Sequence, residues 1–396
     1  MTGILFVTES FHPVLGGGET HIRRLGARLV RSGFASTVVT RRSERGWARE
    51  DEVDGIRVLR VSPAGPARVG KYLMVPSALA ALRREARRHD VVVVRGTRIL
   101  GVPALLAARG AGRPVVLQPE VNGEWSGEVY TWGHGRRAAR LLAPAVSLRN
   151  LWLRDADAFV AMSRAIREEM VGAGVPRERV ALIPHGVDTD RFRPADPAER
   201  ALLRRRLFLP EGVLVLYTGR LLRGKGLETL MAAFASVAAQ EDAARLVLVG
   251  SGAGQALSIE DALRKRASEG DLAGRVVFTG RVDDVADHVR AADIFAFPSV
   301  FEALGISLVE ASAAGLPSVA SRTGGIVDVI EEGRSGILVT PGSEEELASA
   351  LLALVRSPPH RARMGREARR VALLRFDERD GVARYRALFA ETSARR

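Results

Sequence analysis

Short runs of β-branched residues alternate with longer helical segments along the whole chain, and this alternation is the feature that most restricts the fold. A run such as Val91-Val92-Val93-Val94 is followed by a Gly, Ser or Pro residue and then by a stretch rich in Ala, Leu and Arg. Continuous apolar strands between helices are typical of parallel sheets that are covered by helices on both faces. The sequence therefore predicts an α/β fold built from doubly wound parallel sheets.

Two series of predicted strands divide the chain into two domains. The first series comprises residues 4–8, 36–40, 56–61, 91–94, 114–117, 158–161 and 180–183, and the second comprises residues 213–218, 245–249, 276–279, 294–297, 318–320 and 337–339. A connection that contains Pro184, Gly186 and Pro194 separates the two series. We therefore expect Rossmann-like domains at residues 1–190 and 191–375. Residues 366–396 are helical in pattern, and we expect a final helix, 376–396, to pack back on the first domain.

Length and composition agree with this organisation. A chain of 396 residues exceeds the size at which a single hydrophobic core stops growing. No window approaches the roughly 18 consecutive apolar residues that a membrane-spanning helix needs, and residues 1–10 lack the pattern of a signal peptide. The chain contains no cysteine, which excludes disulfides and Cys-ligated zinc and suits a reducing compartment. We therefore expect a cytoplasmic protein.

Most of the excess positive charge lies in the first half of the chain. Residues 1–190 contain 29 Lys and Arg residues against 19 Asp and Glu residues, which is a surplus of 10 out of the net +13. Two groups of arginines recur at helical neighbour spacing, namely Arg83, Arg84, Arg87 and Arg88, and Arg136, Arg137 and Arg140. Two interpretations stay open: solvated helix faces, or attraction of the first domain to anionic lipid or to an anionic acceptor. Nucleic acid is not expected, because these arginines are not interleaved with aromatic residues.

A glycine-rich loop follows the first predicted strand. Gly16, Gly17 and Gly18 precede a predicted helix at residues 22–31. Glycines let a ligand approach the backbone, and the free N–H groups at a helix start favour a negative group. A tight turn explains the same glycines equally well. The loop is not a dinucleotide fingerprint, because no acidic residue closes the second strand, which ends at Arg41.

A basic loop follows the first strand of the second series. Residues 217–226 read Tyr-Thr-Gly-Arg-Leu-Leu-Arg-Gly-Lys-Gly and lie between a buried strand and a helix. Cations at the carboxyl end of a parallel strand suit a diphosphate, because they oppose the charge that develops on a departing phosphate oxygen. We favour this role for Arg220 and Lys225 over that of a solvated basic loop.

Two glutamates eight residues apart follow a later strand. Glu302 falls in the loop before a predicted helix, and Glu310 falls inside that helix among Leu308, Val309 and Ala311. A carboxylate in such apolar company needs a partner. Both glutamates are suited to hold an oxygen-rich ligand such as a sugar or ribose, while the amides of the helix start face phosphate. A solvated helix face is the alternative.

Other candidate sites have simpler interpretations. Asp283 and Asp284 precede a predicted helix and are interpreted as its cap rather than as a metal pair, and Ser163 is interpreted as the N-cap of another helix. The seven histidines show no metal-ligand spacing, and no nucleophile elbow is present. We therefore expect neither a metal nor a cofactor.

Taken in order, these segments resemble the retaining glycosyltransferases of the GT-B fold known as family 4, or glycosyl transferases group 1. The resemblance covers nearly the whole chain and is densest after residue 180. It is carried by residues 16–18, by 180–188 (Val-Ala-Leu-Ile-Pro-His-Gly-Val-Asp), by 219–226, by 246–252, by 278–280, by 302–310, by 324–326 and by 333–336. It implies two Rossmann-like domains that face a cleft, an acceptor-binding first domain, a second domain that binds a nucleotide-sugar donor, and metal-independent sugar transfer in glycan biosynthesis.

The resemblance also implies roles for the residues of the second domain. Arg220 and Lys225 are similar to the pair that grips the donor diphosphate and stabilises the leaving group. Glu302 is similar to the first glutamate of the family's paired motif, which contacts the donor sugar. Glu310 is similar to the second glutamate, which holds the ribose. Three further substrate-binding positions are implied: the backbone amides of Gly305 and Ile306, and the base-contacting segment around Val282.

In the first domain the resemblance implies that Gly17 and Gly18 approach the diphosphate, but two positions depart from the family pattern. Many members carry a histidine after the fifth strand, where this chain has Glu120, and the family's asparagine before Gly-Val-Asp is replaced by His185. Glu120 is accordingly a candidate substrate-binding residue. Because of these departures, a catalytically impaired nucleotide-sugar binder stays an alternative. A sugar-nucleotide epimerase is a second one, and a dehydrogenase is a weaker one.

Overall fold

The structure, a computed structural model, describes residues 2–394 apart from 15, 66–70 and 256. It divides into two compact units, of which the first comprises residues 1–185 and 379–396 and the second comprises residues 186–378. The chain therefore passes between the units twice. Within the described residues, none of the helices combines the length and apolar character needed to cross a bilayer.

The first unit contains an eight-stranded sheet in the order β3-β4-β2-β1-β5-β6-β7-β8. Neighbouring strands are parallel except for β3 and β4, which are antiparallel. The strands are β1 (Gly3–Thr8), β2 (Ala35–Arg41), β3 (Glu50–Val53), β4 (Ile56–Val61), β5 (Val91–Arg95), β6 (Val115–Gln118), β7 (Ala158–Ala161) and β8 (Val180–Leu182).

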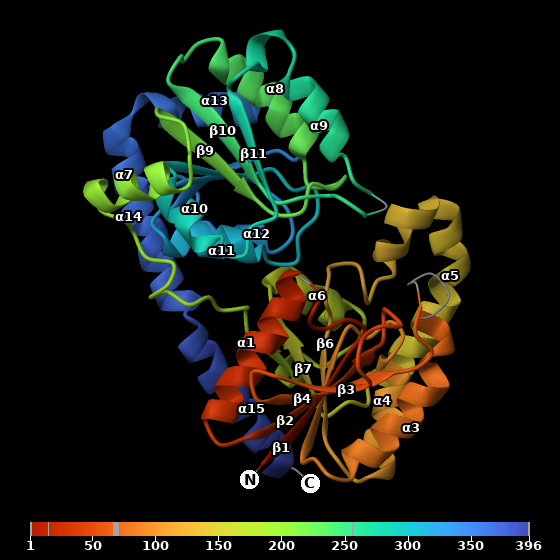
Figure 1. Cartoon of the computed structure of the whole chain (residues 1–396). Coiled ribbons are helices and arrows are strands. Elements are labelled where there is room, and N and C mark those ends of the chain that lie inside the picture. Colours follow the sequence, from red (N-terminus) through yellow and green to blue (C-terminus); the bar gives the residue numbers. More distant parts are fainter. Residues whose placement is uncertain (1, 15, 66–70, 256, 395–396) are drawn as a thin grey trace. The chain divides into compact units, whose positions relative to one another are not determined.

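Helices cover both faces of this sheet (Figure 1). They are α1 (Gly17–Arg31), α3 (Val75–Ala86), α4 (Gly101–Gly110), α5 (Thr131–Leu153), α6 (Arg164–Gly172) and α15 (Glu378–Ala394). Helices α1 and α15 share one core with the strands, in which Leu25 of α1 and Phe389 of α15 pack with Phe6 of β1. Residues 366–396, which are helical in pattern, belong to two helices, because α14 ends at Arg375 and α15 begins at Glu378.

The second unit contains a six-stranded, wholly parallel sheet in the order β11-β10-β9-β12-β13-β14. Its strands are β9 (Val213–Thr218), β10 (Ala244–Val249), β11 (Val276–Gly280), β12 (Ile294–Phe297), β13 (Ser318–Ser321) and β14 (Gly336–Val339). Its helices are α7 (Pro197–Arg206), α8 (Leu227–Ala238), α9 (Glu260–Ala267), α10 (Ala286–Ala291), α11 (Ile306–Ala313), α12 (Ile326–Val329), α13 (Glu344–Arg356) and α14 (Pro358–Arg375).

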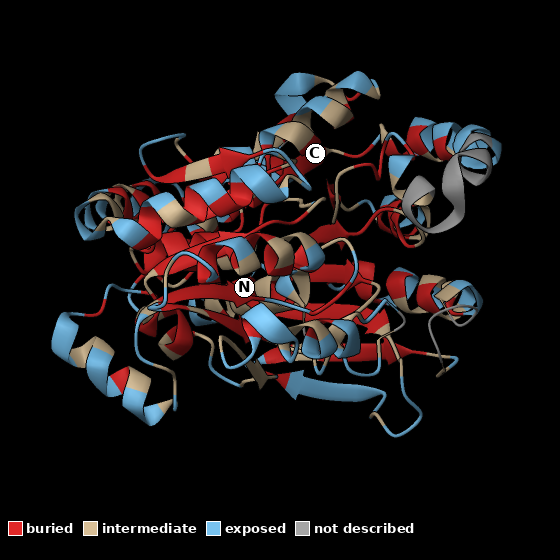
Figure 2. Ribbon diagram, turned by 90° about the horizontal axis from the view of Figure 1, so that it is seen from above, coloured by how far each residue is buried: buried red, intermediate tan, exposed pale blue. Residues whose placement is uncertain are grey.

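The burial pattern explains why these segments form strands between helices. The central strands are buried along their whole length, whereas the outward faces of the helices are exposed (Figure 2). In each sheet one strand marks the point where the strand order reverses: β1 lies between β2 and β5, and β9 lies between β10 and β12. Open α/β sheets bind ligands in the crevice outside the carboxyl ends of the strands at this switch point.

Candidate functional site

The switch point of the second unit brings together the two motifs that were predicted to bind a ligand. Strands β9 and β12 are neighbours, with Val215 paired to Ile294 and Leu216 paired to Phe295. The basic loop, 219–226, follows β9, and the loop with Glu302 follows β12. Both loops therefore leave the same edge of the sheet side by side.

The two loops are in backbone contact. Gly226 has a φ of 68°, and a β-carbon there would lie 1.9 Å from the carbonyl oxygen of Pro298. Next to this contact, the Val300 N–H donates a hydrogen bond of 3.0 Å to the carbonyl oxygen of Gly224. A side chain at residue 226 would force the loops apart, so glycine is required at this position. The close approach fixes the residue between the two glycines, Lys225, against the second loop.

Lys225 and Glu302 form an ion pair across the two loops. The Lys225 Nζ atom lies 2.8 Å from Glu302 Oε2, and the two side chains are 24% and 18% exposed. The pair is therefore reachable by a ligand but is not fully solvated. The carbonyl oxygen of Glu302 accepts a hydrogen bond of 3.1 Å from the Gly325 N–H, so the backbone that carries the carboxylate is anchored as well.

The N-terminus of α11 lies beside this pair. Gly305 is the N-cap residue, with a φ of 88°, and Ile306 is the first residue of the helix. Because the N-cap residue is a glycine, it offers no side chain to cap this helix start. The first N–H groups of a helix lack partners within it and carry its positive dipole end, so they favour an anion. A lysine and a helix mouth thus flank the same position.

Arg220 is the second residue after the end of β9 and is exposed. Its backbone is anchored, because the Tyr217 hydroxyl donates a hydrogen bond of 3.2 Å to the Arg220 carbonyl oxygen. Its guanidinium Nη1 lies 3.5 Å from Gln255 Oε1. The side chain is therefore available at the edge where Lys225 also lies, without being held in the Lys225–Glu302 pair.

Of the two other predicted positions of this unit, Glu310 lies within α11 and Val282 lies farther along the sheet edge. Glu310 is buried on α11, with 8% of the residue exposed. Val282 is partly exposed and follows β11, which is the outermost strand on the β10 side of β9. The predicted residues thus extend from the switch point to the edge strand of the sheet.

The predicted residues of the first unit lie at its own sheet edge. Gly17 and Gly18 are not in a loop, because α1 begins at Gly17 and Gly16 is its N-cap residue. A β-carbon at Gly18 would meet the guanidinium of Arg95, which ends β5 and is 5% exposed. Arg95 Nη1 in turn lies 3.2 Å from Glu120 Oε1. Glu120 is therefore a paired carboxylate that lies near the start of α1.

A second buried glutamate supports Glu120. Glu124 is fully buried and accepts hydrogen bonds from the Thr97 N–H, from the Thr97 hydroxyl at 2.7 Å and from the Glu120 N–H at 2.9 Å. Burial raises the pKa of Glu120 above its ordinary value, although Arg95 acts in the opposite direction. The position that carries histidine in many family members therefore holds a carboxyl group that binds a proton more readily than usual.

Sequence reasoning missed most of this cluster. Burial also raises the pKa of Glu9, which follows β1. Burial alone would lower the pKa of Arg98, but Glu124, Glu9 and Glu120 together raise it. Ligand-binding residues of open α/β sheets come after the carboxyl ends of the strands. Glu9 comes directly after β1, so this rule, applied to the first unit, is the signal that finds Glu9. Arg98 and Glu124 lie a few residues beyond their strands.

The loop that carries these glutamates, 119–127, is held from its other side by α5 and α6. Both carboxylate oxygens of Glu169 accept backbone N–H groups, from Gly123 at 2.8 Å and from Trp125 and Ser126 at 2.7 Å. Asn150 Nδ2 donates to the Trp125 carbonyl oxygen at 2.7 Å. These contacts fix the loop independently of any ligand.

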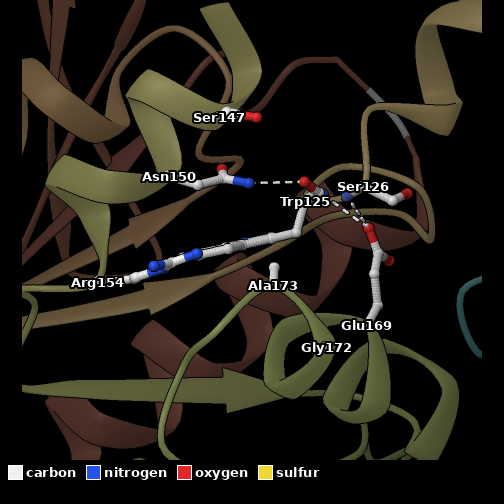
Figure 3. A pocket seen from close by; sticks show the side chains of 8 residues that line it. All are labelled: Trp125, Ser126, Ser147, Asn150, Arg154, Glu169, Gly172 and Ala173. Atoms are coloured by element: carbon white, nitrogen blue, oxygen red, sulfur yellow. Dashed lines mark hydrogen bonds between the residues drawn. The ribbon is translucent and has the colours of Figure 1, made fainter. Parts of the chain in front are cut away.

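A cavity of about 380 Å³ lies where this loop meets α5 and α6 (Figure 3). None of the predicted site residues lines it. Asn150 and Glu169 face it with polar groups that already hold the loop. Its lining consists of Trp125, Ser126, Ser147, Asn150, Arg154, Glu169, Gly172 and Ala173.

His185, which replaces the family's asparagine, is buried in the first unit. Its ring stacks on that of His21, with 3.7 Å between the ring centroids and 15° between the planes. Burial, followed by the charge of Arg95, lowers the pKa of His21 to about 3, and burial also lowers the pKa of His185. Both imidazoles are therefore neutral at pH 7 and belong to the packing of α1 against the strand ends.

The remaining candidates have the structural roles that the sequence predicts. Asp284 Oδ1 accepts the Ala286 N–H at 2.8 Å at the start of α10, and the Ser163 hydroxyl caps α6 by accepting the Ile166 N–H. Ser163 is thus the N-cap residue of α6, as predicted, whereas Asp284 bonds the first residue of α10 from the position before its N-cap residue, Val285. In the described part of the chain, no cluster of three or more His, Asp or Glu side chains is arranged to hold a metal ion.

Comparison with known proteins identifies the family. Residues 15–191 match the family model "Glycosyltransferase Family 4", and residues 212–357 match the model "Glycosyl transferases group 1". The chain is 32% identical to a GDP-mannose-dependent alpha-(1-6)-phosphatidylinositol monomannoside mannosyltransferase of Mycobacterium tuberculosis, over 93% of both chains. It is 31% identical to a D-inositol 3-phosphate glycosyltransferase of Xylanimonas cellulosilytica, over 96% of this chain and 93% of that one.

Solved structures show the same fold. The HepE protein of Anabaena in complex with UDP superposes with a TM-score of 0.76 and 22% identity, over 99% of this chain and all of that one. A sucrose-phosphate synthase from Thermosynechococcus elongatus superposes with a TM-score of 0.83 and 23% identity over the whole of both chains. The chain belongs to glycosyltransferase family 4, the glycosyl transferases group 1, and is a glycosyltransferase of the GT-B fold that uses a nucleotide sugar.

Proposed function

We propose that the donor diphosphate binds at the switch point of the second unit and that transfer retains the configuration of the anomeric carbon. The observation that carries this proposal is the Lys225–Glu302 ion pair, 2.8 Å long, beside the N-terminus of α11, whose N-cap residue is Gly305. A cation and a helix start at one position are suited to a diphosphate. A carboxylate next to the cation is suited to the hydroxyls of the attached sugar.

The same proposal assigns a role to each predicted residue of the second unit. Lys225 and Arg220 neutralise the departing diphosphate, and the amides of Gly305 and Ile306 donate to it. Glu302 binds the donor sugar and Glu310 binds the ribose. Val282, which follows the edge strand β11, contacts the base. The residues that follow β9 and β12 flank the switch point, and Val282 follows the edge strand β11, which supports a donor whose base lies away from its diphosphate.

In the first unit, Gly17, Gly18 and Glu120 are the proposed substrate-binding positions. The contacts of Arg95 with Gly18 and Glu120 place all three at one edge of the sheet. Glu120 is the proposed acceptor-side group in place of the family's histidine, and the elevated pKa that burial gives it supports a role in proton handling there.

The acceptor hydroxyl attacks on the face from which the diphosphate departs, through an oxocarbenium-like state. The barrier falls because positive charge and helix N–H groups oppose the charge that develops on the leaving phosphate oxygen. By analogy with the loss of one oxyanion-hole donor, removal of one such group costs about 2.7–4 kcal/mol in the barrier. We propose that Arg220 and Lys225 make a metal ion unnecessary, and activity that survives EDTA is the expected result.

The relatives suggest which substrates to test first. The relative from Mycobacterium tuberculosis is, by name, a GDP-mannose-dependent mannosyltransferase of a phosphatidylinositol monomannoside. The relative from Xylanimonas cellulosilytica is, by name, a glycosyltransferase of D-inositol 3-phosphate. We propose GDP-mannose as the first donor and a phosphoinositol-bearing hydroxyl compound as the first acceptor. The proposed location is the cytoplasm, in peripheral contact with the inner face of a membrane, to which the basic charge of the first unit is complementary.

Turnover by the Lys225→Ala variant tests the proposal. We expect kcat to fall at least tenfold, because the variant loses a charge that acts on the leaving group, while circular dichroism shows an unchanged fold. Lys265→Ala removes an exposed lysine on α9 and serves as the matched control with unchanged kcat. Wild-type turnover in Lys225→Ala contradicts the proposal.

Product analysis separates the alternatives. Donor binding without sugar transfer or release would identify a catalytically impaired binder. Conversion of the donor sugar in the absence of any acceptor would identify an epimerase. Formation of a glycosylated acceptor with the anomeric configuration of the donor is the outcome that we expect.

A further inference from the structure

Helix α5 of the first unit contains a segment that is apolar and exposed at every position. Residues 141–145 read Leu-Leu-Ala-Pro-Ala, and all five are exposed. Helices of globular proteins bury an apolar stripe and expose polar residues, so a turn without a polar or a buried residue is unusual. No charged residue occurs from Leu141 to Leu148.

The apolar exposure continues to the end of the helix. Leu141 is 83% exposed, Leu148 60%, Leu151 59% and Trp152 47%. Leu141, Leu148 and Trp152 follow one another at intervals of seven and four residues, which places them on one face of the helix. Exposed apolar surface of this extent marks a contact with a membrane or with another protein.

Positive charge accompanies this face. Helix α4 packs against both α3 and α5, so the three helices form one layer over the sheet (Figure 1). Arg83 and Arg84 at the end of α3, and Arg87 and Arg88 just after it, are exposed. The buried Glu85 forms ion pairs with Arg84 and Arg88. Arg136, Arg137 and Arg140 precede the apolar segment in the sequence, in a part of α5 whose side chains lie outside the described residues.

These charges favour an anionic bilayer over a second copy of the chain as the partner of this face. A second copy of the chain, docked face to face, would bring like-charged arginines together, and like charges across an interface are unfavourable. An anionic bilayer offers both an apolar interior for the leucines and negative headgroups for the arginines. Tryptophan, as at Trp152, is enriched at membrane interfaces because its ring is apolar while its N–H is polar.

We propose that α5 lies in the headgroup region of an anionic membrane, with Leu141, Leu148, Leu151 and Trp152 turned toward the acyl chains. This inference rests on the proposed function in one respect: it identifies the acceptor as a molecule anchored in that bilayer. It assigns the membrane contact to a defined surface of the first unit instead of to its net charge.

The inner side of the same helix holds the candidate acceptor loop. Arg149 Nη2 donates to the Glu124 carbonyl oxygen at 2.6 Å, and Asn150 Nδ2 donates to the Trp125 carbonyl oxygen at 2.7 Å. Arg149 and Asn150 lie between the exposed Leu148 and Leu151 in the sequence. The helix that meets the bilayer is therefore also the helix that positions the loop of Glu120 and Glu124, so a membrane-anchored acceptor arrives next to that loop.

Flotation with lipid vesicles tests the proposal. The protein is mixed with vesicles of phosphatidylcholine alone, or with vesicles in which about 30% of the lipid is the anionic phosphatidylglycerol. We expect the wild type to float with the anionic vesicles and the Leu141→Glu/Leu148→Glu variant to bind at least tenfold more weakly. The matched control is Leu202→Glu/Leu374→Glu, which places the same charges at exposed leucines of the second unit. This control should bind as the wild type does.

Three results would overturn the proposal. In the first, the wild type floats with neither kind of vesicle. In the second, the Leu141→Glu/Leu148→Glu variant binds vesicles as the wild type does. In the third, light scattering shows that the wild type is a dimer while this variant is a monomer. The last result would show that a second copy covers the face. Donor-induced stabilisation of the same variant, measured without lipid, shows whether the donor site is intact, so failure of membrane binding and failure of the proposed donor site are distinguishable.

Discussion

Phe208 adopts a backbone conformation that its residue type disfavours. It follows α7 with a φ of 52°, in the left-handed region, and its side chain is 93% exposed. Helices commonly end with glycine in this conformation, because a β-carbon costs roughly 1 kcal/mol there. We predict that Phe208→Gly raises the free energy of unfolding by about 0.5–1 kcal/mol, since no buried contact is lost.

Urea denaturation of the two proteins measures this effect. Phe208→Ala is the control, because alanine removes the aromatic ring but keeps a β-carbon in the same conformation. We expect no stabilisation from alanine. A glycine variant that is no more stable than the alanine variant would show that the backbone at Phe208 is not strained.

The stacked imidazoles of His21 and His185 make stability depend on pH. Burial, followed by the charges of Arg95 and Arg24, lowers the pKa of His21 in the folded protein to about 3. Burial, followed by His21 and Arg95, also lowers the pKa of His185. The unfolded chain therefore binds protons at these residues below pH 6.5, whereas the folded chain does not. The stabilisation is fully present above pH 6.5 and is lost as the pH falls toward 3.

We predict that, well below pH 6.5, each of these histidines lowers the free energy of unfolding by about 1.4 kcal/mol for every unit by which the pH falls. The His21→Phe variant keeps a ring for stacking but cannot bind a proton. Between pH 6 and pH 4, its free energy of unfolding should therefore fall less steeply than that of the wild type, by the slope that one bound proton contributes. Superimposable pH profiles of the two proteins would refute this origin of the acid sensitivity.

At the residue scale, the sequence indicates the candidate residues of the second unit more directly than those of the first. Lys225 and Glu302 both follow buried strands, and ligands of open α/β sheets bind outside the carboxyl ends of the strands, so the sequence alone indicates both residues. Arg95 was missed because it is the last residue of β5, inside the strand itself. The Lys225–Glu302 distance and the pairing of Glu120 with Arg95 depend on contacts between residues far apart in the sequence, which no local pattern encodes.

At the scale of elements, the break between α14 and α15 comes from a tertiary contact. The Val187 N–H donates to the Phe376 carbonyl oxygen at 2.8 Å, and the Glu378 N–H donates to the Val187 carbonyl oxygen at 3.1 Å. Residues 376–378 thus pair with a distant segment instead of continuing the helix. Because this stretch contains neither Pro nor Gly, no local pattern indicates the break.

Gly186 is the residue that permits this pairing. A β-carbon there would lie 2.5 Å from Glu378 Cα and 2.7 Å from its backbone nitrogen. We predict that Gly186→Ala separates the two segments and lowers the melting temperature by several degrees, as a destabilisation of about 1–3 kcal/mol would. Calorimetry of the variant measures it.

Gly381→Ala is the matched control for Gly186→Ala. Gly381 lies in α15, and a β-carbon there would meet no atom within 4 Å. Alanine is favoured over glycine in a helix by about 0.5–1 kcal/mol, so this variant should be slightly more stable than the wild type. Equal losses in both variants would contradict a specific role for Gly186.

Most elements could be predicted from the sequence, because nearly all strands are buried apolar runs between helices. Strand β3 was missed because its sequence, Glu-Asp-Glu-Val, is mostly acidic and exposed. The signal that could have found it is the dipeptide Asp54-Gly55, whose φ values of 53° and 79° form the two-residue turn between β3 and β4. Asp-Gly between two strands is a typical hairpin turn.

At the scale of the whole molecule, each unit has its own sheet with its own switch point, and charged residues gather at both. The first unit places arginines and carboxylates together after β1, β5 and β6. The second unit places Arg220, Lys225 and Glu302 after β9 and β12. The central claim is that the second of these positions holds the diphosphate of a nucleotide sugar.

Thermal unfolding in the presence of GDP-, UDP- and ADP-sugars tests this claim most directly. A donor at 100 times its Kd stabilises the folded state by about 2.7 kcal/mol, which corresponds to a rise in Tm of about 5–10 °C for a unit of this size. We predict such a rise for one class of donor with the wild type and with Lys265→Ala, and a much smaller rise with Lys225→Ala. A wild type whose Tm no nucleotide sugar raises, or a Lys225→Ala variant with the full wild-type shift, would contradict the account.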